Sequence, residues 1–150
     1  MCIRDSTGTV IPKETLIDFC LSASKETIIF SDEAYYDFIQ TPNYPSMDFL
    51  VKEEKNIIVS RTFSKVYGLA GFRIGYLIVP SHLSKQIRKN VVAKSNVLAI
   101  AAADKALEDK EFYNFSLNKI KQGRNMITTT LDKLGLNYVP SNTNFVFFHL

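Results

Sequence analysis

The sequence predicts an α/β protein with a mostly parallel sheet flanked by helices. Three observations indicate this class: short apolar runs typical of strands, helical patterns before and after them, and polar residues where the strands end. The chain has 150 residues, of which 46% are hydrophobic, so it is long enough and apolar enough to bury a core.

The first predicted elements are a helix and a strand. The helix covers 12–25, because Pro12 stands at its start and apolar residues then recur at helical spacing. A β-prone run over 27–31 follows and ends at Asp32. The segment 42–45 contains two prolines and an asparagine, which predicts a loop.

Two further apolar runs read as strands. They are "NIIVS" at 56–60 and "GYLIV" at 75–79, the second closed by Pro80. Because these two runs and the run at 27–31 are continuous instead of alternating, we expect strands buried on both faces. Ligands bind at the carboxyl ends of strands in such sheets, so Asp32 and the polar residues after 56–60 are expected to share one crevice.

The second half of the chain is mainly helical in pattern. Ser81 can cap a helix that runs to about Lys94, and an alanine-rich helix is expected over 99–109. A long amphipathic helix over 111–134 follows, with a glycine as its C-terminal stop. The final segment, "FVFFHL", reads as a strand.

Composition narrows the class of partner and compartment. The formal net charge of +3 is mild and the basic residues are scattered, which indicates solvated helix faces and no nucleic-acid site. Cys2 and Cys20 form neither a metal-ligand spacing nor a disulfide framework, so a reduced, cytoplasmic location is the simplest interpretation. No run has membrane-spanning length, and Arg4 and Asp5 interrupt any signal-peptide core.

A cluster of polar side chains in "VSRTFSKVYGLAGFRIGYLIV" carries the chemistry. Thr62 and Ser64 offer hydroxyl donors and Arg73 a guanidinium, and a phosphate accepts hydrogen bonds from both. Three glycines let the backbone turn tightly and approach a ligand. The G-x-x-x-x-G-K spacing is absent, so this is a phosphate cup of another kind, with the amine of Lys65 beside it.

An amine beside a phosphate suggests a Schiff base between Lys65 and a phosphorylated aldehyde cofactor. Lysine suits this role because its amine loses its proton more readily in a desolvated, cationic site. Such a cofactor needs an acid against its ring nitrogen, and Asp32 is the candidate; Tyr35 could hydrogen-bond the ring hydroxyl. From position alone there are two alternative interpretations: Lys65 as a surface charge and Asp32 as a strand-end cap.

Two stretches closely resemble a known family. "SDEAYYDF" at 31–38 and "SRTFSKVYGLAGFRIGY" at 60–76 resemble the pyridoxal-phosphate-dependent aminotransferases of class I/II (fold type I), above all their histidinol-phosphate aminotransferase branch. "TGTVIP" at 7–12 and "VPSNTNFVFF" at 139–148 are similar to two further elements of this family. The resemblance therefore covers nearly all of the chain from Thr7 onward.

The resemblance implies a role for each residue of the cluster. Lys65 matches the lysine that forms the internal aldimine with pyridoxal 5'-phosphate and then moves the catalytic proton. Asp32 matches the partner of the pyridine nitrogen, and Tyr35 matches the tyrosine on the phenolic oxygen. The implied phosphate contacts are Thr62, Ser64 and Arg73.

The resemblance also implies a domain organisation. We expect 7–125 to be the central part of the large cofactor-binding domain, and 126–150 to be the truncated start of the smaller C-terminal domain. The turn at Thr7 and Gly8 would lie beside the cofactor ring. "MCIRDS" at 1–6 departs from the family's asparagine-proline, so we hypothesise a non-native leader. The family's upstream phosphate loop, a tyrosine from the partner subunit and a downstream substrate-carboxylate arginine have no counterpart in the chain.

The implied activity is amino transfer between a small-molecule amino donor and a 2-oxo acid acceptor, with histidinol phosphate and 2-oxoglutarate as the leading pair. The family also implies a homodimer, with neither nucleic acid nor membrane as a partner. Alternatives are an aromatic or other class I/II aminotransferase, a lyase or synthase on the same fold, and the sensor domain of a transcriptional regulator. The 150-residue chain by itself is expected to be inactive.

Overall fold

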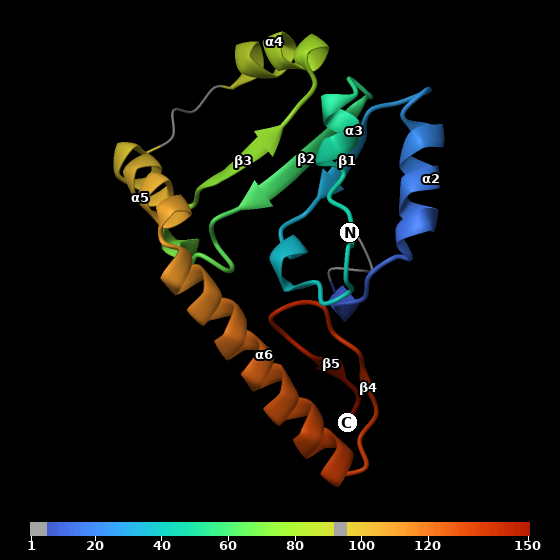
Figure 1. Cartoon of the computed structure of the whole chain (residues 1–150), viewed down its shortest axis with the longest axis vertical. Helices are drawn as coiled ribbons and strands as arrows, with labels where there is room; N and C mark the ends of the chain where they lie inside the picture. Colours follow the sequence, from blue (N-terminus) through green and yellow to red (C-terminus); the bar gives the residue numbers. More distant parts are fainter. Residues whose placement is uncertain (1–5, 92–95) are drawn as a thin grey trace.

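The computed structural model describes residues 6–91 and 96–150, which form helices around two small sheets (Figure 1). The helices are α2 (Lys13–Ala23), α3 (Asp48–Lys52), α4 (Ser81–Asn90), α5 (Val97–Glu108) and α6 (Lys110–Lys133), with 3-10 turns η1 (Tyr36–Phe38) and η2 (Ala70–Phe72). The strands are β1 (Ile29–Asp32), β2 (Ile57–Thr62), β3 (Gly75–Ile78), β4 (Tyr138–Val139) and β5 (Phe147–Phe148).

The larger sheet has the strand order β1-β2-β3. Strands β1 and β2 are parallel, with Ile29 opposite Ile57, whereas β2 and β3 are antiparallel, with Thr62 opposite Gly75. The predicted α/β class is confirmed. One of the two pairings is antiparallel because the loop 63–74 returns the chain along β2, without the crossover helix that a parallel neighbour needs.

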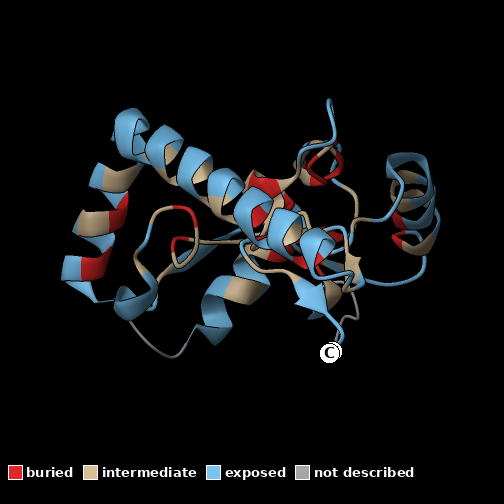
Figure 2. Ribbon diagram, turned by 90° about the horizontal axis from the view of Figure 1, so that it is seen from below, coloured by how far each residue is buried: buried red, intermediate tan, exposed pale blue. Residues whose placement is uncertain are grey.

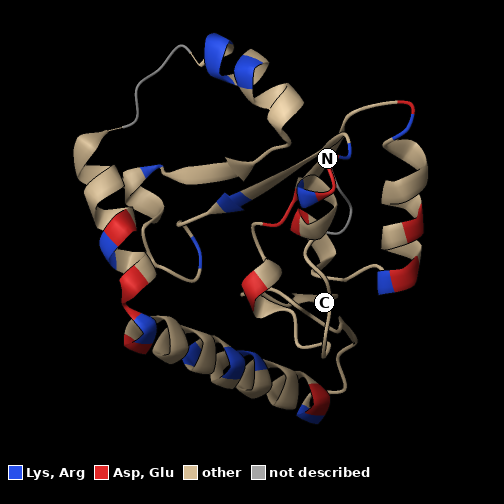
Figure 3. Ribbon diagram, turned by 45° about the horizontal axis from the view of Figure 1, so that its top comes forward, with Lys and Arg blue, Asp and Glu red and all other residues tan. Residues whose placement is uncertain are grey.

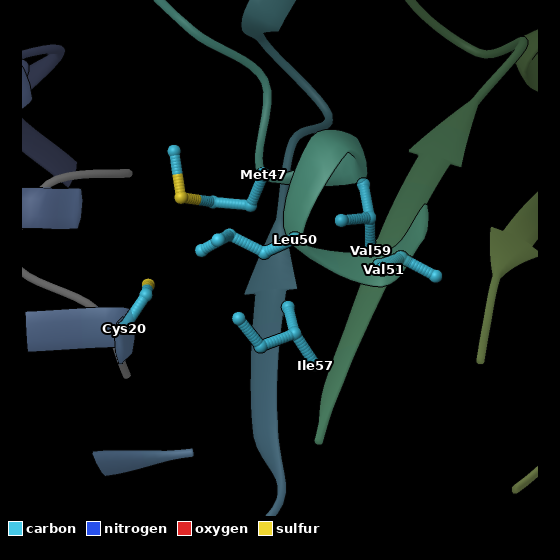
Figure 4. Packing of buried hydrophobic residues seen from close by; sticks show 6 residues of the cluster. All are labelled: Cys20, Met47, Leu50, Val51, Ile57 and Val59. Carbon is cyan, nitrogen blue, oxygen red and sulfur yellow. The ribbon is translucent and has the colours of Figure 1, made fainter. Parts of the chain in front are cut away.

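The core lies where α2 and α3 pack against β1 and β2. Its buried residues are shown in Figure 4: Cys20, Met47, Leu50, Val51, Ile57 and Val59. Leu16, Ile17 and Leu21 of α2 pack against this cluster. The short helix α3 was not predicted, because its five residues are too few to show a helical period.

The expectation of strands buried on both faces is wrong for β1 and β3. Phe30 in β1 is 60% exposed, and Leu77 in β3 is 45% exposed, whereas Ile57 and Val59 of β2 are fully buried. The reason is that α2 and α3 cover one face of the sheet, so side chains on the other face of β1 remain exposed. Figure 2 shows how the buried residues gather around the sheet, while most of α6 is exposed.

The predicted helices of the second half are present with shifted ends. The helix expected over 81–94 ends at Asn90, and residues 92–95 lie outside the described residues. Helix α5 begins earlier than expected because the side chain of Asn96 accepts a hydrogen bond from the backbone of Leu98 at 2.8 Å. The side chain of Asp109 caps α6 in the same way.

The C-terminal segment forms a second sheet of two short antiparallel strands, β4 and β5. Strand β5 confirms the strand predicted in the tail, and β4 was not predicted. Helix α6 leads to this sheet and continues through the expected domain boundary at 125 and 126, so the two-domain division stays a prediction. Of the expected leader 1–6, residues 1–5 lie outside the described residues.

Charged residues are unevenly spread over the helices. In Figure 3 the middle of α6 carries basic positions, and its acidic positions lie near its two ends. Within the described ranges, no helix combines the length and the apolar character that a membrane span requires.

Gly75 begins β3 opposite Thr62 of β2, at a point where a side chain does not fit. A Cβ added there would lie 2.6 Å from the carbonyl oxygen of Arg61, a backbone atom of the neighbouring strand. We expect Gly75→Ala to lower the free energy of unfolding by about 1–3 kcal/mol, because the β2–β3 pair must separate. Urea unfolding measures the change. Gly71→Ala is the matched control, since a Cβ there would meet nothing within 4 Å; an equal loss in both variants would contradict the prediction.

Candidate functional site

The site is built at the edge of the sheet where β1 and β2 end. The two strands are parallel, with Asp32 opposite Ser60, so the last residues of both reach the same edge. The hydroxyl of Ser60 donates a hydrogen bond to Oδ1 of Asp32 at 3.0 Å, and the backbone of Ala34 donates to the same oxygen at 3.1 Å. These two contacts orient the Asp32 carboxylate through Oδ1. Neither of them uses its second oxygen, Oδ2.

The loop that follows β2 carries Lys65 between two buried anchors. Phe63 is 4% exposed and Val66 is fully buried, whereas Lys65 between them is only half-buried. The hydroxyl oxygen of Thr62 accepts from the backbone of Ser64 at 3.0 Å, which turns the chain directly after the strand. The apolar-polar-polar-apolar pattern of 63–66 thus fixes the backbone and presents the lysine side chain.

The amine of Lys65 lies over the face of a site tyrosine. Its Nζ is 4.9 Å from the centre of the Tyr35 ring, within the range of a cation–π contact. Phe145, from the segment before β5, meets the same ring edge-on with ring centres 5.7 Å apart. Two distant parts of the chain, the loop of Lys65 and the segment of Phe145, therefore converge on Tyr35, and the structure places this tyrosine and the lysine side by side.

Arg73 stands at the far end of the same loop. The backbone of Phe63 donates to the carbonyl of Ile74 at 3.2 Å, which closes the loop and returns Arg73 to the end of β2. Arg73 is exposed, and its Nη1 donates to the carbonyl of Ala70 at 3.0 Å. Its φ of +50° lies in the left-handed region, a costly conformation for a residue other than glycine that is typical of ligand-binding turns.

The structure thus brings five of the six predicted site residues to one edge of the sheet: Asp32, Tyr35, Thr62, Ser64 and Lys65. Arg73 shares their loop, but its guanidinium contacts its own turn. The roles predicted for all six remain predictions, since they concern a bound cofactor.

The turn at Gly8 packs against the C-terminal segment. Gly8 has a φ of +77°, and a Cβ there would lie 2.9 Å from the hydroxyl oxygen of Ser141. The backbone of Asn142 donates to the carbonyl of Gly8 at 2.8 Å. Only glycine meets both constraints, and the result joins the beginning of the described chain to the segment that contains Phe145.

Sequence reasoning missed a buried ion pair next to the site. Glu33 is 5% exposed, and its carboxylate accepts from the Arg61 guanidinium at 2.8 Å. Burial lowers the pKa of Arg61, but the charge and hydrogen bonds of Glu33 outweigh this, so the pKa is raised. A signal was present: neighbouring residues of an extended chain point to opposite sides, so Asp32 and Glu33 cannot share one environment.

A second group of side chains supports the lysine loop from α6. The Tyr67 ring, two residues after Lys65, packs against Tyr113 with ring centres 5.5 Å apart. The Tyr113 hydroxyl donates to Oδ1 of Asp37 at 2.7 Å. Burial, followed by this hydrogen bond and the Asp37 charge, raises the pKa of Tyr113. Tyr113 is therefore a hydrogen-bond donor at neutral pH and links the loop, α6 and η1.

Asp32 at the end of a strand, the ring of Tyr35 and the half-buried Lys65 thus lie at one edge of an α/β sheet, the place where open α/β sheets bind ligands. The family model for aminotransferase class I and II matches residues 1–150. The chain belongs to this family.

Several relatives are named histidinol-phosphate aminotransferases. One from Halalkalibacterium halodurans is 35% identical over 98% of this chain and 40% of its own length. The structure of one from Sinorhizobium meliloti, in complex with pyridoxal-5'-phosphate, is 32% identical with a TM-score of 0.82 and covers 93% of this chain and 38% of that one. An aspartate aminotransferase from Thermotoga maritima is 27% identical, with a TM-score of 0.80, over 96% of this chain and 39% of its own. The chain therefore spans about two fifths of these relatives.

Proposed function

We propose that the protein to which this chain belongs is a pyridoxal 5'-phosphate-dependent aminotransferase. It would transfer an amino group between an amino acid or amine and a 2-oxo acid. The observation that carries the proposal is the amine of Lys65, held over the Tyr35 ring beside two hydroxyl-bearing residues at the ends of parallel strands. Membership of the aminotransferase class I and II family supports it.

The residues present fit this cofactor by the chemistry of their donors. Asp32, whose Oδ1 already accepts two hydrogen bonds, offers its second oxygen to a protonated pyridine nitrogen. Tyr35 would donate to the ring hydroxyl. Thr62, Ser64 and Arg73 would bind the phosphate, as hydroxyl and guanidinium donors do.

Lys65 is the catalytic residue of the proposal. When bound, the cofactor supplies an aldehyde for a covalent bond with this amine and a ring that withdraws electrons from the substrate carbon. The position of Lys65 between the buried Phe63 and Val66 limits the reach of its amine to one side of the loop. From there the released amine would take a proton from the substrate and return it, while Tyr35 holds its orientation.

The substrate assignment rests on the relatives. Histidinol-phosphate aminotransferases are among them, so histidinol phosphate with 2-oxoglutarate is the proposed pair. We also propose a cytoplasmic location, in keeping with the free Cys20 buried in the core, and a homodimer, as the family resemblance implies.

The test uses the full-length protein encoded by the gene that contains this chain. Titration with pyridoxal 5'-phosphate is expected to produce a visible absorption band, and histidinol phosphate with 2-oxoglutarate should then yield glutamate. A visible band without glutamate formation from this pair, but with it from aspartate or an aromatic amino acid, would reassign the substrate. Absence of the band would overturn the proposed function.

Arg73 is the test of the phosphate site. We expect Arg73→Ala in the full-length protein to weaken pyridoxal 5'-phosphate binding by about thirtyfold, because a charged hydrogen bond to the phosphate is lost. Pyridoxal without phosphate should bind both forms equally. The measurement is absorption titration, and Arg88→Ala on the exposed face of α4 is the control. An unchanged affinity for the phosphorylated cofactor would remove Arg73 from the site.

A further inference from the structure

The carboxylate of Glu33 is a buried centre of hydrogen bonds directly behind the site. It accepts from the Ser46 hydroxyl at 2.7 Å and from the Met47 backbone at 2.7 Å. It also accepts from Nε of Arg61 at 3.2 Å and from its second guanidinium nitrogen at 2.8 Å. Glu33 thereby joins the end of β1, strand β2 and the turn that begins α3.

A buried ion pair has a high desolvation cost for a contact that only connects three elements of the fold. Moving a carboxylate and a guanidinium out of water costs several kcal/mol each, and an apolar pair of similar size is often as stable. The core beside it, built from Met47, Leu50 and Val59, shows that apolar packing is available at this place. What the ion pair adds is direction. Two guanidinium nitrogens of Arg61 and the Ser46 hydroxyl converge on Oε2 of Glu33 while the Met47 backbone holds Oε1, which favours one placement of the two side chains.

The fixed geometry of the ion pair affects the site because Glu33 and Arg61 are each next to a site residue in the sequence. Glu33 follows Asp32, and Arg61 precedes Thr62. The guanidinium of Arg61 also lies over the ring of Tyr36, 4.4 Å from its centre. Tyr36 is the next residue after Tyr35, and its hydroxyl donates to the carbonyl of Tyr44 at 3.1 Å.

The turn after β1 is therefore held at two points by one side chain of β2. Arg61 forms an ion pair with Glu33 and a cation–π contact with the ring of Tyr36. Tyr35 lies between these two residues in the sequence. The Tyr35 ring in turn meets Nζ of Lys65, which the same strand β2 presents through its loop. A shift of Arg61 relative to β1 would change the distance between the tyrosine and the lysine.

We propose that Glu33 and Arg61 are positioning residues that set the geometry of Asp32 and Tyr35 against Lys65, an inference that rests on the proposed function. Neither residue is among those proposed to hold the cofactor. Their effect on the cofactor passes through the turn 32–36 and is separable from their effect on stability.

The test compares Glu33→Gln, Arg61→Met and the double variant in the full-length protein. Each single variant leaves one buried group without its charged partner, so both should melt at a lower temperature. In the double variant neither charge remains, so the melting temperature should return toward that of the unmodified protein. All three should bind pyridoxal 5'-phosphate at least about tenfold more weakly and lose intensity in the visible circular dichroism of the bound cofactor.

The double variant decides the question even if a single variant does not fold. If it recovers the melting temperature, the cofactor affinity and the dichroism band together, the pair only stabilises the fold and the inference is wrong. Glu54→Gln is the matched control, because this exposed carboxylate also accepts hydrogen bonds, from Ser81 at the start of α4. It should leave the dichroism band unchanged. If the unmodified protein shows no band, the proposed function fails and the inference falls with it; a band that all three variants retain in full overturns the inference alone.

Discussion

Replacing Lys65 by alanine is expected to abolish covalent attachment of pyridoxal 5'-phosphate to the full-length protein. Borohydride reduces the bond between a lysine amine and the cofactor's aldehyde to a stable one, so mass spectrometry should find the label on the peptide that contains Lys65. The alanine variant has no amine at this position and should show no label there. The loss at this peptide should be complete because the reaction needs a primary amine and alanine has none.

Two variants separate covalent attachment from simple charge. Lys65→Arg keeps a cation that can lie over the Tyr35 ring, but it should also remain unlabelled. Lys52→Ala removes an exposed lysine of α3 and should leave the labelling intact. Label that persists on another peptide of the Lys65→Ala protein, at the original yield, would show that the catalytic lysine lies elsewhere.

Ile57→Ala is expected to lower the free energy of unfolding by about 2–5 kcal/mol. Ile57 is fully buried in β2 and faces Met47 and Leu50 in the core. Removing three carbon atoms there leaves a cavity that a paired central strand cannot collapse to fill. Because β2 carries the loop of Lys65, weaker cofactor binding should accompany the loss of stability.

Ile127 provides the matched control for this substitution. It is 46% exposed on α6, so Ile127→Ala should change the unfolding free energy by no more than about 0.5 kcal/mol. Urea unfolding of the two variants gives the comparison. Equal losses in both would mean that the cluster around Ile57 does not form the principal core.

The regular elements near the site were readable from local patterns. The run "NIIVS" predicted β2, and the run that ends at Asp32 predicted β1, each within two residues of the observed ends. The reason is that these strands have continuous apolar residues bounded by polar ones, a signal that needs no partner to be seen. The short helix α3 and strand β4 carry too few residues for such a signal.

Burial was less predictable than secondary structure. The apolar residues of β1 and β3 suggested strands covered on both faces, yet Phe30 and Leu77 are exposed. Hydrophobicity tells which residues gain from burial, but not whether the chain supplies a second layer to cover them. The direction of β3 was not predictable from local patterns either. A connection of twelve residues can lead to a parallel or to an antiparallel strand, and the residue pattern inside the strand is the same in both cases.

The residue types of the site could be read from the sequence: a lysine, a strand-end aspartate, two hydroxyls and an arginine within a glycine-containing loop, together with the family that these residues identify. How these side chains are held followed from the three-dimensional fold. Glu33 and Arg61 are 28 positions apart, and so are Asp32 and Ser60. Side chains so far apart along the chain meet because parallel strands bring their ends to one edge, and no local pattern records that meeting.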